Sequence, residues 1–156
     1  MAANVWLDID DDVSVAGLPT QADCQRYIGA VLAALNISQP CSVDIRVVGI
    51  NEGRALNAQY RDKDYATNVL SFAAELPEAL LAELDERPLG DLAICAAVVA
   101  READEQGKPL AAHWICSAMI ILRLRMRRAW SPWSARYYRR WASITRMMTR
   151  LWKRGI

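Results

Sequence analysis

The acidic residues of this chain are confined to one part of it, and this limits which part can form an ordinary globular domain. All 18 Asp and Glu residues lie between Asp8 and Glu105. Residues 111–156 contain no acid, but hold 11 of the 19 Lys and Arg residues and five of the six Trp residues. Such a break is typical of a tail that binds nucleic acid or membrane, and a change of reading frame also produces one. We expect one folded domain in residues 1–114 and a basic tail in residues 115–156.

The overall composition fits a globular protein. With 156 residues, 53% of them hydrophobic and 24% charged, the chain is neither collagen-like nor intrinsically disordered. The four Cys residues show no CxxC spacing, so we expect free, buried thiols and no disulfide scaffold. The N-terminus lacks the basic and apolar regions of a signal peptide, and the longest apolar run, 92–100, is far shorter than the ~20 residues of a spanning helix. We therefore expect a cytoplasmic protein without a membrane partner.

Hydrophobic periodicity predicts strands that alternate with helices. Residues 75–88 are acidic and contain two prolines, so they are expected to form a loop or a loose helix. The pattern favours an α+β fold, a small mixed β-sheet of about four strands with flanking helices. The expected strands are 5–10, 42–50, 68–72 and 90–95, and the expected helices are 20–36, 52–60 and 97–106, the last of them closed by Gly107.

Two stretches of the sequence resemble a known family. The first, residues 60–72, reads Tyr-Arg-Asp-Lys-Asp-Tyr-Ala-Thr-Asn-Val-Leu-Ser-Phe, and the second covers Leu89–Cys95 with residues 100–103 and 106–108. They are similar to the YbeY family of bacterial metal-dependent endoribonucleases, over residues 1–114. The resemblance implies zinc-dependent hydrolysis of single-stranded RNA in 16S ribosomal RNA 3′-end maturation and ribosome quality control. It also implies ribosomal RNA and the small ribosomal subunit as partners, and no DNA.

The resemblance assigns residues of the polar stretch to RNA binding. Arg61 matches the family's polar-loop arginine and is the expected catalytic contact, because a guanidinium is always charged and can bind a phosphate through two hydrogen bonds. Lys63, Thr67, Asn68 and Ser71 are the expected substrate-binding residues. Taken from this chain alone, the same residues also fit a solvated loop arginine with ordinary turn and strand neighbours.

The family's metal-binding segment is missing from the sequence. In the family, the signature His-Gly-x-Leu-His-Leu-x-Gly-Tyr-Asp-His supplies three imidazoles to one zinc and leaves a fourth position open for water. This chain has a single histidine, His113, upstream of where the signature would lie. We therefore expect no metal-ligating residues, no bound zinc, and a chain that is catalytically inactive. His113, beside Trp114, is expected to pack or to cap a helix.

The genetic code suggests why the signature is missing. When residues 115–121 are read one base out of frame, codons compatible with them encode Leu-Leu-Gly-Tyr-Asp-His, and the Asp is forced by the Met119–Ile120 pair. We infer that a short segment after Trp114, including the first ligand histidine, was deleted with a net change of frame. The metal-site helix would then be replaced by the Arg/Trp-rich tail.

Two other functions also fit the sequence. The chain can be a non-catalytic RNA- or ribosome-binding protein that uses its basic tail, since Lys, Arg and Trp neutralise phosphates and stack on bases. The tail could equally lie on an anionic membrane surface. Asp91 and Glu102 resemble a pair of catalytic carboxylates, but a Gly-Asp sequence is also a common entry into a strand.

Overall fold

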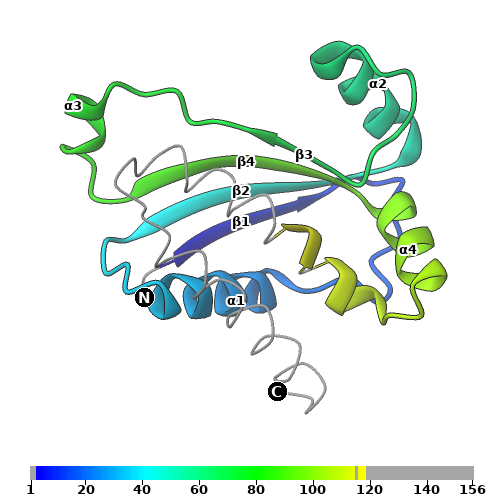
Figure 1. The fold of residues 1–156 in the computed structure, drawn as a ribbon, viewed down its shortest axis with the longest axis horizontal. Helices are drawn as coiled ribbons and strands as arrows, with labels where there is room; N and C mark the ends of the chain where they lie inside the picture. Colours follow the sequence, from blue (N-terminus) through cyan, green and yellow to red (C-terminus); the bar gives the residue numbers. More distant parts are fainter. Residues whose placement is uncertain (1–2, 115, 119–156) are drawn as a thin grey trace.

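The computed structural model describes residues 3–114 and 116–118, and in them strands alternate with helices as expected (Figure 1). Helical residues also occur at 110–114 and 116–118, directly after α4. No helix in the described ranges is long and apolar enough to cross a membrane. The elements are β1 (Ala3–Ile9), α1 (Gln21–Ala34), β2 (Cys41–Val48), α2 (Ile50–Arg61), β3 (Val69–Phe72), α3 (Glu78–Leu81), β4 (Arg87–Cys95) and α4 (Ala96–Glu105).

The four strands form one mixed sheet in the order β1-β2-β4-β3. β1, β2 and β4 are parallel, whereas β3 is antiparallel to β4. The predicted α+β class, with about four strands and flanking helices, is therefore confirmed. The carboxyl ends of the three parallel strands meet at one end of the sheet, where α2 and α4 also lie, and α3 lies at the opposite end (Figure 1).

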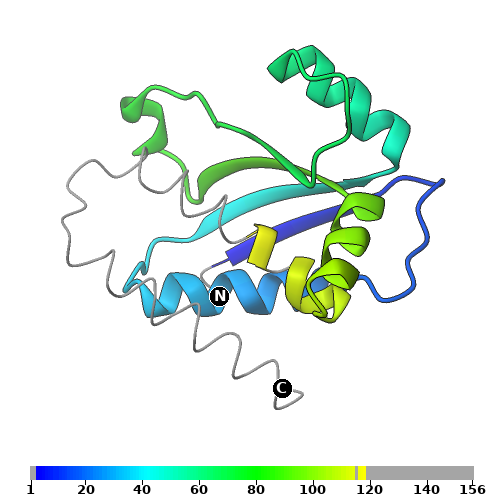
Figure 2. The same cartoon turned by 45° about the vertical axis from the view of Figure 1, so that its right-hand side comes forward.

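One face of the sheet carries the main hydrophobic core. Val5, Val43 and Ile45 alternate with exposed residues along β1 and β2 and pack against α1. Trp114, only 2% exposed, and Ala118 belong to the same core, so the helical residues after α4 are packed into the domain. The expected domain boundary falls inside this segment, and the residues of the proposed tail from 119 onward lie outside the described part. Figure 2 shows this segment beside α4 and α1.

The opposite face of the sheet carries a second, smaller hydrophobic cluster at the carboxyl end of the strands, where Val48 and Cys95 pack with Leu56 of α2. The rest of this face includes exposed charged residues. We call Trp6, Asp8, Asp44, Arg46 and Asp91 the outer face; they line a shallow hollow of about 400 Å³. Asp44 and Asp91 lie opposite each other in the β2–β4 register. This face therefore presents carboxylates next to an exposed tryptophan.

Helix α1 begins where the sequence predicts and also covers the free edge of the sheet. Thr20 is its N-cap and forms a capping box with Asp23, and the hydrogen bonds from Thr20 lower the pKa of the Asp23 carboxyl. Gln21 accepts a hydrogen bond from the Leu7 N–H at 3.3 Å, and Gln25 donates to the Ala3 carbonyl at 3.0 Å. These side chains occupy backbone hydrogen-bonding groups at the edge of β1 with which another strand could otherwise pair.

Strand β4 begins earlier than predicted. It includes Pro88, which the sequence placed in a loop, because β3 pairs only with Asp91–Ile94 and leaves this part of β4 without a neighbour on that side. The β2–β4 register shifts between Ser42 and Asp44, so β4 has one extra residue there. Gly90 lies in this bulge at φ 111°, and a Cβ at this position would collide with the Phe72 carbonyl oxygen.

The cysteines are free thiols, as expected. Cys24, Cys41 and Cys95 are buried and Cys116 is partly buried. Burial raises the pKa of Cys24 to about 12 and that of Cys41 to about 11. These two thiols are therefore protonated and unreactive at neutral pH.

Candidate functional site

The connection between α2 and β3 gathers four of the five predicted site residues. We call residues 61–68 the polar loop; it lies at the end of the sheet where the parallel strands finish. Arg61 is the last residue of α2 and Lys63 follows it, both exposed to solvent. Thr67 and Asn68 are half-buried where the loop meets β3. Ser71 lies within β3 itself, opposite Leu92.

Side chains of α2 hold the polar loop in place. The Arg54 guanidinium binds both carboxylate oxygens of Asp64, at 2.7 and 2.8 Å, and lowers the pKa of that carboxyl. Asn57, buried in α2, donates to the Tyr65 carbonyl at 2.6 Å. Asp62 ends the helix in the left-handed conformation at φ 55°. The loop is thus tied to the helix that precedes it at several points.

The two arginines of α2 differ in their charge partners. Arg54 is neutralised by Asp64, whereas the Arg61 guanidinium has no ion-pair partner within residues 3–114 and 116–118. The residues are seven positions apart and so lie on the same side of the helix. Arg61 is therefore the arginine of this helix that is available to a phosphate.

The far end of the polar loop is fixed through Asn68. Its backbone carbonyl accepts a hydrogen bond from the Cys95 N–H at 2.9 Å, and its side-chain oxygen accepts from the Val69 N–H at 2.7 Å. The side-chain nitrogen donates to Oε2 of Glu102 at 3.1 Å. Asn68 thus joins the polar loop to both β4 and α4.

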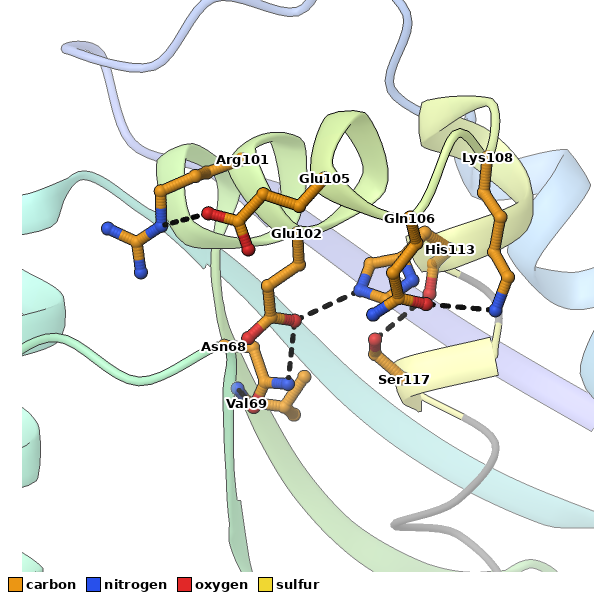
Figure 3. A network of polar contacts seen from close by, with 9 residues as sticks. All are labelled: Asn68, Val69, Arg101, Glu102, Glu105, Gln106, Lys108, His113 and Ser117. Atoms are coloured by element: carbon orange, nitrogen blue, oxygen red, sulfur yellow. Dashed lines mark hydrogen bonds and ion pairs between the residues drawn. The ribbon is translucent and has the colours of Figure 1, made fainter.

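Glu102 is the centre of a polar network (Figure 3). Its Oε2 also lies 2.9 Å from Nε2 of His113. Burial alone would raise the pKa of Glu102, but the hydrogen bonds from His113 and Asn68 outweigh it and hold the pKa below the ordinary 4.5. The carboxylate is therefore ionised at neutral pH and can only accept, so the imidazole donates its Nε2–H.

His113 is buried, as the sequence predicts for a packing residue. It is 7% exposed, and its backbone carbonyl accepts a hydrogen bond from the Ser117 hydroxyl at 2.9 Å. Its Nδ1 is buried without a hydrogen-bonding partner in the described part of the chain. The imidazole thus has a single polar partner there, the Glu102 carboxylate.

Glu102 was underestimated at the sequence level, where it appeared only as half of a carboxylate pair with Asp91. The structure assigns the two residues to different surroundings: Asp91 belongs to the outer face, and Glu102 binds Asn68 and His113. One signal was present, because Glu102 follows Val98 and Val99 at the helical spacing of buried positions. A carboxylate in an apolar stripe requires a partner.

The residues described here do not fit the three-imidazole zinc site that the resemblance implies. No cluster of three or more His, Cys, Asp or Glu side chains that could hold a metal occurs in residues 3–114 and 116–118. The chain's only imidazole is bound to Glu102, and no Asp or Glu follows residue 105. Cys116 is the remaining candidate nearby, and burial raises the pKa of its thiol.

Comparison with known proteins gives the family. Residues 8–120 match the family described as Endoribonuclease YbeY. The chain belongs to the YbeY family. Proteins named Endoribonuclease YbeY from Alkalilimnicola ehrlichii and Stenotrophomonas maltophilia are each 54% identical over 99 residues, or 64% of this chain. One from Cellvibrio japonicus is 43% identical over 108 residues, or 69% of this chain.

The match covers only part of these YbeY relatives. The aligned region spans 58% of the Alkalilimnicola and Cellvibrio proteins and 60% of the Stenotrophomonas protein. A solution structure of a Thermotoga maritima protein has the same fold, with a TM-score of 0.58 at 14% identity, covering 97% of this chain and 93% of that one. Family membership and fold are thus shown over the region that contains the polar loop and the Glu102 network.

Proposed function

We propose that this chain retains the RNA-binding surface of a single-strand-specific endoribonuclease of 16S ribosomal RNA 3′-end maturation and does not cleave the RNA itself. Its partners would be ribosomal RNA and the small ribosomal subunit in the cytoplasm, without DNA or membrane. Arg61 would contact a phosphate, and Lys63 and Thr67 would follow the backbone of the strand. Hydrolysis is not part of this proposal, because the zinc ligands of the family are missing.

The observation that carries the proposal is the un-neutralised Arg61 in a loop held by α2. A guanidinium without an acidic partner suits a phosphate, to which it can form two charged hydrogen bonds. Because the chain belongs to a family whose relatives are named endoribonucleases, the phosphate bound by Arg61 is expected to be part of an RNA backbone. Asn68 anchors the other end of the same loop to β4 and α4.

The missing hydrolysis follows from ligand number. A catalytic zinc needs three protein ligands and an open position for water. With one histidine in the whole chain, already paired with Glu102, the family's three-imidazole site has no counterpart. The inferred deletion and change of frame after Trp114 remains our explanation of this loss.

A second candidate function uses the basic tail. The 11 Lys and Arg residues without a single acid in residues 111–156 favour a non-catalytic RNA- or ribosome-binding protein in which the tail supplies most of the affinity. This function and the first differ in which region binds RNA. Variants of the polar loop and of the tail therefore distinguish them.

The proposal is tested by metal content together with RNA cleavage. The full chain is dialysed against a weak chelator, its zinc is measured by atomic emission, and it is incubated with a single-stranded 16S 3′-end RNA. We expect well below ~1 zinc per chain and no cleavage, because about three protein ligands are required. The matched control carries the complete histidine signature after Trp114 and should hold ~1 zinc and cleave. Stoichiometric zinc or cleavage by the unaltered chain would contradict the proposal.

A further inference from the structure

One carboxylate oxygen connects two segments that are distant in the sequence. Oε2 of Glu102 accepts from the Asn68 side chain at 3.1 Å and lies 2.9 Å from Nε2 of His113. Asn68 is the last residue of the polar loop, and His113 belongs to the helical residues after α4. Figure 3 shows Glu102 reaching down from α4 to both partners. Within residues 3–114 and 116–118, the Asn68 amide nitrogen has no other hydrogen-bonding partner.

The surroundings make this contact stronger than an ordinary surface pair. The Glu102 side chain is 29% exposed and that of His113 is 9% exposed, so solvent competes only in part. Hydrogen bonds to an ionised group at such distances are stronger than those between neutral groups. Glu105, one turn further along α4, is a useful contrast: it is 66% exposed and contacts Arg101 at only 3.9 Å.

Loss of the Glu102 carboxylate would release both partners. His113 would then be a buried imidazole with no polar partner in the described residues, because its Nδ1 already has none. Asn68 would lose the acceptor that ties its side chain to α4 and would keep only its contacts with Val69 and Cys95. The end of the polar loop would therefore be anchored less firmly, although its start is still held by Arg54 and Asn57.

We infer that Glu102 is a positioning residue for RNA binding: by holding Asn68 to His113, it fixes the far end of the polar loop and thereby the position of Thr67, the neighbouring residue proposed to contact the RNA backbone. The inference rests on the proposed function of the loop. It goes further by assigning to a residue on another helix the task of holding the RNA-binding loop at its far end. His113 acts in this arrangement as the buried donor that orients the carboxylate.

Hydrogen exchange tests the structural part in the full chain. Glu102→Gln and Glu105→Gln each remove one negative charge from the same helix, so they change net charge equally. We expect the amides of residues 62–69 to exchange on the order of tenfold faster in Glu102→Gln, because the charged hydrogen bonds from Asn68 and His113 are replaced by weaker, neutral ones. In Glu105→Gln they should be unchanged. Equal exchange in both variants would overturn the inference.

A double-mutant cycle tests the functional part with a single-stranded RNA oligonucleotide. Thr67→Ala should weaken binding about threefold in the wild-type and Glu105→Gln backgrounds, but less than about 1.5-fold in Glu102→Gln, because a displaced Thr67 already contributes less to binding. Additive effects of Thr67→Ala and Glu102→Gln would overturn the inference. If Arg61→Ala leaves affinity unchanged in every background, the proposed function fails, and hydrogen exchange alone then decides whether Glu102 fixes the loop.

A second variant covers the possibility that Glu102→Gln does not fold. Asn68→Ser removes the donor to Glu102, keeps an oxygen that can accept from the Val69 N–H, and leaves the Glu102–His113 pair intact. It should reproduce the faster loop exchange and the reduced effect of Thr67→Ala. Normal exchange and a full Thr67→Ala effect in this variant would overturn the inference.

Discussion

The polar loop and the outer face belong to the same sheet but suit different ligands. In the loop, Arg61 and Lys63 are exposed, and the nearby Asp64 is already bound by Arg54. On the outer face, Asp44 and Asp91 lie opposite each other. The difference favours the loop, and not the outer face, as the site of the proposed contact with an RNA phosphate.

The basic residue of the outer face does not reverse this conclusion. Arg46 binds both carboxylate oxygens of Asp10, at 2.8 and 3.0 Å, and also contacts Glu52 at 3.3 Å. Its charge is thereby compensated, and this part of the surface carries no excess of positive charge. An exposed aromatic residue, Trp6, is present there, but stacking without phosphate neutralisation gives little affinity for RNA.

The largest expected effect concerns Arg61 in a chain that carries the complete histidine signature. Arg61→Ala should lower the rate of single-stranded RNA cleavage by about 100–1000-fold, because a preorganised charge contact with the transition state is lost. Arg61→Lys should restore little of the cleavage rate, since a lysine ammonium cannot form the two parallel hydrogen bonds that a guanidinium forms with a phosphate. Initial rates at saturating RNA measure the effect.

Two controls sharpen the comparison between loop and outer face. Arg54→Ala removes a neighbouring positive charge that is already neutralised, and its effect on cleavage should be at most a few-fold. Asp44→Asn changes the outer face and should leave the rate nearly unchanged. If either control matched Arg61→Ala, general charge and not the position of Arg61 would determine activity.

Local rules were sufficient to predict most elements of the fold. The capping pattern at Thr20, the alternation along β2 and Gly107 after α4 each act over a few residues, and each element was found close to its predicted place. Pro88 was misassigned because its acceptability depends on where β3 stops, which is a tertiary property. Strand order and the bulge at Gly90 are likewise set by pairings between distant segments.

The candidate site likewise has one part that a local sequence motif indicates and another that depends on tertiary contacts. Arg61, Lys63, Thr67 and Asn68 are close in the sequence, so one motif could indicate all of them. Glu102 and His113 could not be connected with Asn68 from spacing, because the contact joins a loop, a helix and a following helical segment across 34 and 11 residues. Only packing brings these groups to one carboxylate oxygen.

The tail is expected to have an effect of intermediate size, which is seen in the salt dependence of RNA binding. If about half of its basic residues contact phosphates, log affinity should fall with log salt with a slope of roughly −3.5 for a single strand. Removal of residues 119–156 preserves the buried Ala118 and should abolish most of this slope while leaving the Arg61-dependent part. A tail that prefers 16S 3′-end RNA about tenfold over a scrambled strand would instead act by specific recognition.

The smallest expected effect is the pH dependence of stability that comes from Glu102. In the folded protein its pKa lies below the ordinary 4.5, because the hydrogen bonds from His113 and Asn68 outweigh the opposing effect of burial. A carboxyl with a lowered pKa stabilises the folded state above its unfolded pKa, and this contribution disappears as the pH falls through the folded value. In urea unfolding, the stability gap between wild type and Glu102→Gln should therefore be constant near neutral pH and shrink below about pH 4.5. Glu105→Gln should show a small gap throughout, since its carboxylate makes only the 3.9 Å contact with Arg101. A Glu102→Gln gap that widens on acidification would mean that the protonated carboxyl, and not the carboxylate, holds Asn68 and His113 together.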